Sequence, residues 1–286
     1  MEARTQPGGF SPGAAARLRT ADGRRVFLKA VGPEPNASAP AFHRREAQIV
    51  AALPAGAPVP RLLWSHDEGD GGWVVLVFED VEGRQPALPW RADELGRVLD
   101  ALEALSADLT PSPLPAAVAP PAAAWFETRG RGWRHLLAER PADLDAWSAR
   151  HLAALADLEA KAPEVAAGDT LLHFDVRADN LLLADERVVV VDWPHARVGA
   201  AWVEVALFAP SVAMQGGPPP EELLARHSAG RAADPGAVAA VAAAIAGFFT
   251  WQALQPPLPG LPTLRAFQAA QGAVARGWLA RQTGWR

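Results

Sequence analysis

The residues of this chain that could support chemistry are most concentrated between positions 171 and 193, in the stretch LLHFDVRADNLLLADERVVVVDW. His173 and Asp175 are separated by one residue, Asn180 follows Asp175 by five positions, and Asp192 ends a run of four valines. The apolar segments between Asn180 and Asp192 flank an acidic turn, which predicts a hairpin that returns Asp192 to the neighbourhood of Asn180. The alternative is an accidental polar loop before a buried hairpin, which leaves four ordered polar positions unexplained.

This set of side chains is suited to the transfer of a phosphoryl group from a Mg²⁺-bound nucleotide to a hydroxyl. Mg²⁺ prefers oxygen ligands, which an asparagine amide and a carboxylate supply. A second carboxylate must orient the attacking hydroxyl and accept its proton, while the rest of the site contributes positioning and charge neutralisation. Asp175, Asn180 and Asp192 provide all three groups.

From these residues the chain resembles the aminoglycoside phosphotransferase family, relatives of the protein kinases with a typical catalytic loop H-G-D-x₄-N followed by D-x-[DE]. The resemblance implies that Asp175 is the catalytic aspartate, that Asn180 and Asp192 are the metal ligands, and that His173 organises the loop near Asp192. Arg177 lies where protein kinases place a lysine that can touch the transferring phosphate. A solvent-facing arginine is the competing interpretation for that position.

The first third of the chain agrees with the resemblance through Lys29 and Glu46. Lys29 follows Val26-Phe27-Leu28 on an expected strand, and Glu46 lies on the next expected helix. In the family such a lysine binds the nucleotide's α- and β-phosphates and the glutamate orients it. Lys29 is also one of only two lysines among 27 basic residues, which favours a function over an exposed surface charge.

Two further nucleotide contacts are implied by the resemblance. The segment from Gly8 to Gly13, with Gly9 and Ser11 inside it, could close over the phosphates, although it is not G-x-G-x-x-G. The strand that ends near Glu79 and Val81 would lead to the hinge, where backbone groups usually meet the adenine.

Three positions depart from the family pattern. Phe174 replaces the usual glycine of the catalytic loop, and Asp192 is followed by Trp193-Pro194, so the carboxylate of D-x-[DE] is missing. Glu204 stands where the family often has an aspartate that stabilises the catalytic lobe, with an exposed helical glutamate as the alternative.

The order of expected elements is typical of an α+β fold, namely the bilobal protein-kinase-like fold that the resemblance implies. Residues 1–82 would form a small β-rich N-lobe that binds nucleotide, and residues 83–286 a larger, mainly helical C-lobe with the catalytic loop and substrate-binding helices. The expected N-lobe elements are strands at 14–19, 24–31, 61–67 and 73–81 and a helix at 39–53. The expected C-lobe helices are 91–108, 121–138, 143–161, 201–212, 219–230, 236–254 and 262–281, interrupted by the β segment 180–191.

Bulk composition excludes several functional classes. The chain has 286 residues, 50% of them hydrophobic, and a net charge of −5, as in ordinary globular proteins. It has no basic stripe to suggest nucleic-acid binding, and its N-terminus MEARTQPGG lacks a signal-peptide pattern. No apolar run reaches about 18 residues without a break, so no membrane association is predicted. The absence of cysteine fits a cytoplasmic protein.

The predicted acceptor is a hydroxylated small molecule, such as an antibiotic, a sugar-like compound or another metabolite. Only about eight residues separate Asp192 from the helix expected near Ala201, too few for the long segment with which protein kinases dock a peptide. Residues 205–286 contain six arginines and three carboxylates, which favours a neutral or anionic acceptor over a polycationic one. Phe248, Phe249 and Trp251 are candidates for an aromatic pocket wall, with core packing as the commoner role of such residues.

The sequence therefore predicts a kinase that uses Mg²⁺ and ATP or GTP, in a monomer or homodimer. The alternative is a nucleotide-binding pseudokinase with a sensor or scaffold role, which Phe174 and Pro194 motivate. Retention of Lys29, Asp175 and Asn180 together with Asp192 argues against it. A helical-bundle interaction protein would not explain the β-rich first third.

Overall fold

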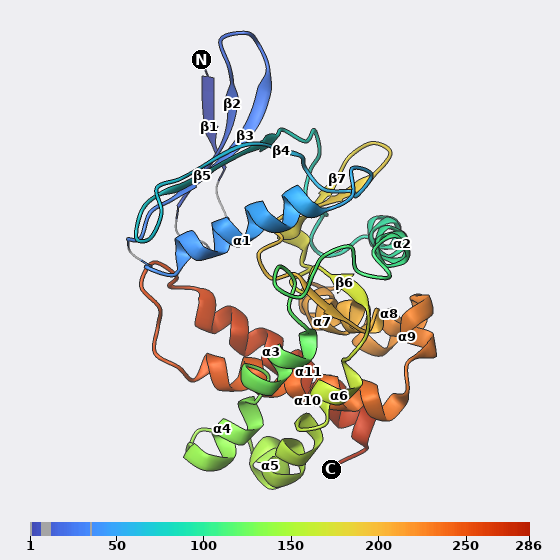
Figure 1. Cartoon of the computed structure of the whole chain (residues 1–286). Coiled ribbons are helices and arrows are strands. Elements are labelled where there is room, and N and C mark those ends of the chain that lie inside the picture. The colour runs from blue at the N-terminus through green and yellow to red at the C-terminus, as the bar shows by residue number, and fades with distance from the viewer. Residues whose placement is uncertain (1, 7–12, 35) are drawn as a thin grey trace.

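The computed structural model describes residues 2–6, 13–34 and 36–286. In Figure 1 an antiparallel sheet lies above a mainly helical region, with helix α1 between them. The strands are β1 (Glu2–Thr5), β2 (Ala14–Arg19), β3 (Arg25–Val31), β4 (Leu62–Asp67), β5 (Val74–Glu79), β6 (Thr170–Leu172), β7 (Leu181–Leu183), β8 (Val188–Val190) and β9 (Arg197–Gly199). The helices are α1 (Ala39–Ala52), α2 (Ala92–Asp108), α3 (Ala122–Thr128), α4 (Gly132–Glu139), α5 (Ala146–Glu159), α6 (Ala162–Val165), α7 (Trp202–Met214), α8 (Pro220–Arg226), α9 (Ser228–Ala232), α10 (Pro235–Ala253) and α11 (Leu264–Thr283), with a 3-10 turn η1 at Ala178–Asn180.

The first sheet has the strand order β1-β2-β3-β5-β4, with all neighbours antiparallel. Along β5 the side chains alternate, with Val74, Leu76 and Phe78 buried, because one face of the sheet packs on the core. Helix α1 contributes Ile49 and Val50 to the same core. The α+β class is confirmed, while the division at residues 82 and 83 stays a prediction. Strand β1 was not expected from the sequence.

The helical region is built around α10, which packs against α4, α5, α7 and α11. Among the described residues α10 is the one helix long and apolar enough to cross a membrane by length and composition, contrary to the expectation of no such run. Over half of it is buried inside the protein, with Val241 and Ile245 almost completely so. Core packing accounts for its apolar character.

Two helices expected from the sequence are each broken in two. The range 121–138 divides into α3 and α4, and α4 begins at Gly132, where a Cβ atom would collide with the Gly247 carbonyl group of α10. Two backbone N–H groups in the first turn of α4 donate to the buried Glu159 carboxylate of α5, which satisfies donors that a helix start leaves unpaired. Likewise, the range 219–230 divides at His227 into α8 and α9.

The hairpin β7–β8 contacts both parts of the chain. Arg84, in the segment that follows the sheet, exchanges two backbone hydrogen bonds with Leu183 of β7, at 3.2 and 2.7 Å. On the other strand, the Val190 N–H donates to the Pro58 carbonyl oxygen, in the loop between α1 and β4, at 2.9 Å. The hairpin therefore joins the sheet to the helical region. The pair β6–β9, which precedes and follows the hairpin in sequence, was not predicted.

Candidate active site

A cavity of about 520 Å³ lies where the sheet meets the hairpin. Lys29 and Phe78 line it from the sheet, Glu46 from α1, and Asn180 and Asp192 from the two ends of the hairpin. These residues are far apart in sequence. The fold brings them to one cavity because α1 packs against β3 and β5, and the hairpin is bonded to the segments that follow α1 and β5.

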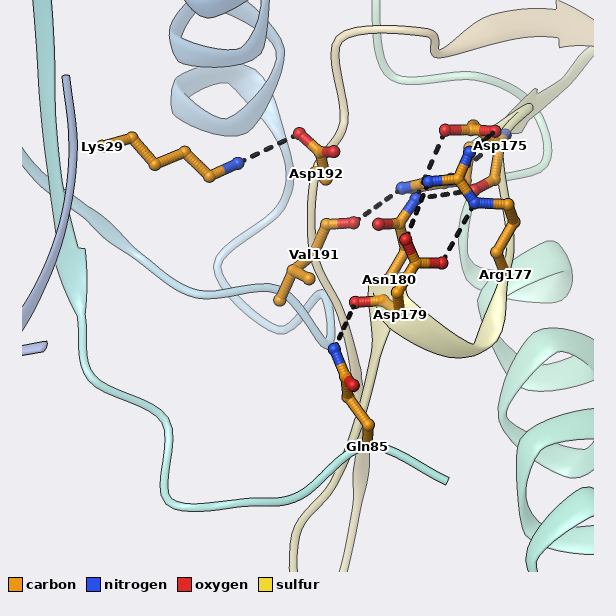
Figure 2. Close-up of polar contacts among 9 residues, drawn as sticks. Lys29, Gln85, Asp175, Arg177, Asp179, Asn180, Val191 and Asp192 are labelled. Atoms are coloured by element: carbon orange, nitrogen blue, oxygen red, sulfur yellow. Dashed lines mark hydrogen bonds and ion pairs between the residues drawn. The ribbon is translucent and has the colours of Figure 1, made fainter. Parts of the chain in front are cut away.

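Lys29 connects the two parts of the site. Its Nζ lies 2.7 and 2.9 Å from the two carboxylate oxygens of Glu46 and 3.0 Å from Oδ1 of Asp192. Burial alone would lower the pKa of Lys29, but the two carboxylates outweigh it and raise that pKa. Burial would raise the pKa of Asp192, but Lys29 holds it at about 2. The ammonium and the Asp192 carboxylate are therefore both charged at neutral pH, and they face each other in Figure 2.

Asp175 lies beside Asn180 and Arg177 (Figure 2). The Asn180 side-chain amide donates to the Asp175 carbonyl oxygen at 2.8 Å and to its carboxylate at 3.3 Å. Arg177 lies 3.3 Å from the Asp175 carboxylate and donates to Asp179 at 2.9 and 3.0 Å. Burial raises the pKa of Asp175, and the Arg177 charge opposes that rise. The Arg177 side chain is only 16% exposed, so its interpretation as a solvent-facing residue is wrong.

His173 is buried and links the catalytic loop to the strand that leads to Asp192. Its Nε2–H donates to the Val191 carbonyl oxygen at 3.0 Å, while Nδ1 accepts from the Asp175 N–H at 3.2 Å. Both bonds are satisfied by one neutral tautomer. Burial lowers the pKa of His173 to about 4, so the ring is neutral at pH 7. These contacts are those of a residue that organises the loop.

Glu204 of α7 holds the same loop from the other side. Its carboxylate accepts hydrogen bonds from the backbone N–H groups of His173 and Phe174, the latter at 3.0 Å. The residue is 7% exposed, so the alternative of an exposed helical glutamate is wrong. Burial raises the pKa of Glu204 to about 7.

Replacing Glu204 with glutamine should lower the free energy of unfolding by about 1–3 kcal/mol, because one of the two buried N–H groups loses its acceptor. Chemical denaturation of both proteins measures the difference. Glu222→Gln on α8 is the matched control, since Glu222 forms an exposed pair with Arg226 and should change stability by no more than about 0.5 kcal/mol. Equal stability of the Glu204 variant and the wild type would contradict the role assigned to this carboxylate.

Phe174 adopts a backbone conformation that glycine adopts more easily than a residue with a side chain. Its φ is +68°, in the left-handed region that costs a residue with a Cβ about 1–2 kcal/mol. The ring packs against Trp125 and Phe126 at centroid distances of 5.4 and 6.1 Å. This burial offsets the strain, and the ring lies against α3 on the helical side of the loop.

Of the further residues expected to contact the nucleotide, the structure describes two. Glu79 and Val81 both line the cavity, although Glu79 also pairs with Arg61 at 2.8 Å and the Val81 carbonyl oxygen accepts from Arg17 at 3.4 Å. Gly9 and Ser11 lie outside the described residues.

Sequence reasoning missed other residues that line the cavity, among them Arg17 and His43. Arg17 lies on β2, the strand that pairs with the one carrying Lys29. His43 precedes Glu46 by three residues on α1, which places both side chains on one face of the helix. This spacing is the only signal that could have identified His43 from the sequence.

Three of the six arginines that suggested a neutral or anionic acceptor form ion pairs away from the cavity. Arg226 and Arg281 form ion pairs with Glu222 and Glu221, and Arg276 pairs with Asp145.

The aromatic candidates for a pocket wall also lie outside the cavity lining. Trp251 stacks on His135 with the ring centroids 4.4 Å apart. Phe248 packs against Trp125 at 5.0 Å and against Phe249 at 5.2 Å. Packing between helices accounts for these contacts.

The oxygen donors fit a Mg²⁺ ion that is shared with phosphate groups. Asp192 offers the carboxylate oxygen that Lys29 does not contact, and the side-chain oxygen of Asn180 is not used in a hydrogen bond among the described residues. No cluster of three or more His, Cys, Asp or Glu side chains in that part of the chain could hold a metal alone. This matches the coordination preference of Mg²⁺, which takes one or two protein carboxylates and completes its shell with phosphate and water.

The sequence model described as the phosphotransferase enzyme family, APH, matches residues 7–271. No curated protein sequence matches the chain. Among solved structures, similarity extends over nearly the whole length. A thermostable mutant of aminoglycoside phosphotransferase APH(4)-Ia in ternary complex with AMP-PNP and hygromycin B has a TM-score of 0.62 at 16% identity, over 99% of this chain and 93% of that one.

Two other structures extend the range of similar proteins. Choline kinase LicA from Streptococcus pneumoniae has a TM-score of 0.62 at 13% identity, over 98% of this chain and 94% of that one. An aminoglycoside phosphotransferase from Alicyclobacillus acidocaldarius has a TM-score of 0.56 at 19% identity, over 98% and 91%. At these identities the likeness shows the fold, which is the kinase-like fold expected from the sequence.

Proposed function

Because this chain belongs to the phosphotransferase enzyme family of small-molecule kinases, we propose that it is an active kinase which transfers the γ-phosphoryl group of a Mg²⁺-bound nucleotide to a hydroxyl of a small molecule. ATP is the proposed nucleotide, with GTP as the alternative, since similar structures contain AMP-PNP or ADP. The acceptor is proposed to be a hydroxylated metabolite or antibiotic, and the proposed location is the cytoplasm.

The observation that carries the proposal is the three-residue contact of Lys29 with Glu46 and Asp192. One ammonium joins β3, α1 and the end of the hairpin at distances of 2.7 to 3.0 Å. An exposed surface lysine would not be expected to contact two carboxylates from separate elements. This contact leaves Lys29 charged and positioned to bind phosphate oxygens on the wall of the cavity.

In the proposed reaction, each of these residues has a separate role. Lys29 would hold the α- and β-phosphates, and Glu46 would keep its side chain in place. Asp175 would orient the acceptor hydroxyl and accept its proton, and the raised pKa of this buried carboxylate makes it a better base than an exposed aspartate. Arg177 lies beside Asp175 and would balance the charges around it as the proton moves.

Mg²⁺ would be held by Asn180 and Asp192, and when bound it neutralises charge on the phosphate oxygens. His173 and Glu204 would keep these ligands and Asp175 in register through their contacts with the backbone. The pseudokinase alternative requires that this whole set be kept without a reaction, and no contact in the described residues favours it.

Calorimetric titration with ATP and with GTP, each with and without Mg²⁺, tests the proposal. We expect one of the two nucleotides to bind more tightly when Mg²⁺ is present, because the metal joins the phosphates to Asn180 and Asp192. Release of nucleoside diphosphate in the presence of a panel of hydroxylated compounds then identifies the acceptor. Failure of both nucleotides to bind at millimolar concentration would overturn the kinase proposal. Tight binding without turnover of any acceptor or water would favour a pseudokinase.

A further inference from the structure

Three arginines on separate elements are not used by the reaction described above, and their elements meet, since α3 packs against β9 and α1 contacts the residue before Arg197. Arg45 lies on α1, Arg129 follows the last residue of α3, and Arg197 begins β9. The Arg45 guanidinium donates to the Ala196 carbonyl oxygen at 2.8 Å, next to Arg197 in sequence. Burial, followed by repulsion from Arg45 and Arg129, lowers the pKa of Arg197 to about 10. We call these three residues the arginine cluster.

The arginine cluster has no anionic partner within the described part of the protein. None of its three guanidinium groups lies within 4.0 Å of a carboxylate in residues 2–6, 13–34 or 36–286. The Nε atoms of Arg45 and Arg197 are also buried without a hydrogen-bond acceptor. A buried donor that lacks an acceptor is costly, and the two cations that repel Arg197 add to that cost. Such an arrangement is expected where a ligand supplies the missing charge.

Arg197 lies beside the residue that precedes Asp175, and the arginine cluster is outside the lining of the nucleotide cavity. The Arg197 guanidinium lies 5.5 Å from the centre of the Phe174 ring, and Phe174 immediately precedes Asp175. None of the three arginines lines the 520 Å³ cavity that contains Lys29 and Asp192. In phosphoryl transfer the attacking and leaving oxygens lie roughly in line, so the acceptor approaches from the side opposite the nucleotide. The unpaired charge is therefore placed for the acceptor and not for the nucleotide phosphates.

Among the described arginines that form no ion pair, Arg45 and Arg197 differ from the rest because their Nε atoms are buried without an acceptor. Arg226 and Arg281 each pair with a glutamate on the surface, and Arg177 pairs with Asp175 and Asp179. The chain thus supplies carboxylates to arginines elsewhere, including one on the catalytic loop itself. In the arginine cluster it brings three cations together and leaves their charge to be balanced from outside.

From this arrangement we infer that the acceptor of the proposed kinase reaction is an anionic hydroxylated small molecule, whose carboxylate or phosphate group pairs with Arg45, Arg129 and Arg197 while its hydroxyl meets Asp175. The inference rests on the proposed function and narrows it. The arginines of residues 205–286 led to the expectation of a neutral or anionic acceptor. The arginine cluster consists of other residues, and it favours an anionic acceptor. The same three charges disfavour a polycationic acceptor.

The first experiment measures anion binding without requiring turnover. The protein saturated with Mg²⁺ and ADP is titrated with sodium sulfate, with sodium chloride at matched ionic strength as reference, and the thermal unfolding temperature is recorded. We expect sulfate to raise this temperature in the wild type and to lose most of that effect in Arg197→Gln and in Arg129→Gln. Arg129 is exposed at the end of a helix, so its variant should fold normally even if the Arg197 variant does not. Arg226→Gln is the matched control.

The second experiment measures turnover with acceptors that differ mainly in charge. ADP release is followed with D-gluconate against D-glucitol, glycerate against glycerol, and D-glucosamine as the cationic member. We expect an anionic member to be preferred, and Arg129→Gln to raise its KM roughly 10- to 100-fold while the KM for the nucleotide stays unchanged.

The outcomes separate this inference from the proposed function. Absence of nucleotide binding would overturn the proposed function and the acceptor assignment with it. Normal nucleotide binding, with sulfate stabilisation equal in the wild type and both variants, would overturn the acceptor assignment alone. Turnover restricted to neutral or cationic acceptors, with the same acceptor KM in Arg129→Gln as in the wild type, would also overturn the acceptor assignment alone. The sulfate titration decides the assignment even if no member of the panel is phosphorylated.

Discussion

Replacing Asp175 with asparagine should lower the rate of phosphoryl transfer by roughly 10²–10⁴-fold, the contribution typical of a positioned general base. Asparagine keeps the size of the side chain and an oxygen that can accept the Asn180 amide, but it cannot take a proton from the acceptor. Because Asp175 is not one of the two expected metal ligands, the affinity for Mg²⁺–nucleotide should stay within a few-fold of the wild type. Initial rates of nucleoside diphosphate release and calorimetric titration measure the two quantities.

Asp179→Asn is the matched control for this variant. Asp179 also accepts hydrogen bonds from Arg177, at 2.9 and 3.0 Å, so its replacement disturbs the same arginine without removing the proposed base. We expect a far smaller loss of rate than for Asp175→Asn. An Asp175 variant that retains full activity would show that the proton leaves by another route and would remove the central role from this residue.

Replacing Asp192 with asparagine should abolish most of the effect of Mg²⁺ on nucleotide binding. The expected loss in affinity for Mg²⁺–nucleotide is at least the roughly 10- to 100-fold that removal of a supporting residue causes at metal sites. The expected reason is the loss of one negative charge from the metal site, together with the ion pair that holds Lys29 at 3.0 Å. Affinity for nucleotide without metal should be unchanged or higher, because the carboxylate no longer repels the phosphates. The difference between titrations with and without Mg²⁺ is therefore the informative quantity.

The control for Asp192→Asn is Asp185→Asn, at the exposed tip of the same hairpin. Its carboxylate forms no hydrogen bond or ion pair among the described residues, and Arg97 donates to its carbonyl oxygen. We expect the control to bind Mg²⁺–nucleotide as the wild type does. Equal Mg²⁺ dependence in the Asp192 variant and the control would contradict the assignment of Asp192 as a metal ligand.

The fold class and the proximity of the chemical groups could be predicted from the sequence because both depend on local patterns. A polar loop followed by an apolar hairpin brings Asn180 and Asp192 close together whatever the rest of the chain does. Likewise, a short continuous apolar run after a glycine-rich turn is enough to predict β5. The resemblance to the phosphotransferase family, carried by the same loop and hairpin, is confirmed. The roles of the individual residues stay predictions that the variants above test.

What the sequence did not predict depends on packing between distant segments. Strands β6 and β9 have three residues each and pair only because the catalytic loop and the hairpin between them fold back on themselves. Nothing local in either segment distinguishes it from a loop. The burial of Glu204 and Arg177 has the same origin, since α7 and α11 must pack in place before either side chain is enclosed.

The charge of the acceptor could not be predicted from a sum of charges over one segment of the sequence. A sum over residues 205–286 counted arginines that the structure places in surface ion pairs, such as Arg226 and Arg281. The arginines that matter for the proposed acceptor lie earlier, at positions 45, 129 and 197, and come together only in the folded chain. Net charge over a segment does not indicate which charges remain without partners.

The backbone bonds of the β7–β8 hairpin have a mechanical consequence. Because Leu183 is bonded to Arg84 and Val190 to Pro58, we expect the sheet and the helical region to rotate about the hairpin when nucleotide enters or leaves. Asn180 and Asp192 sit at the two ends of this pivot, and the Val191 N–H donates to the Asn180 carbonyl oxygen at 2.9 Å. Opening would then separate Lys29 from Asp192 while the two expected metal ligands stay together. Lys29 would therefore release the phosphates before the metal ligands move apart.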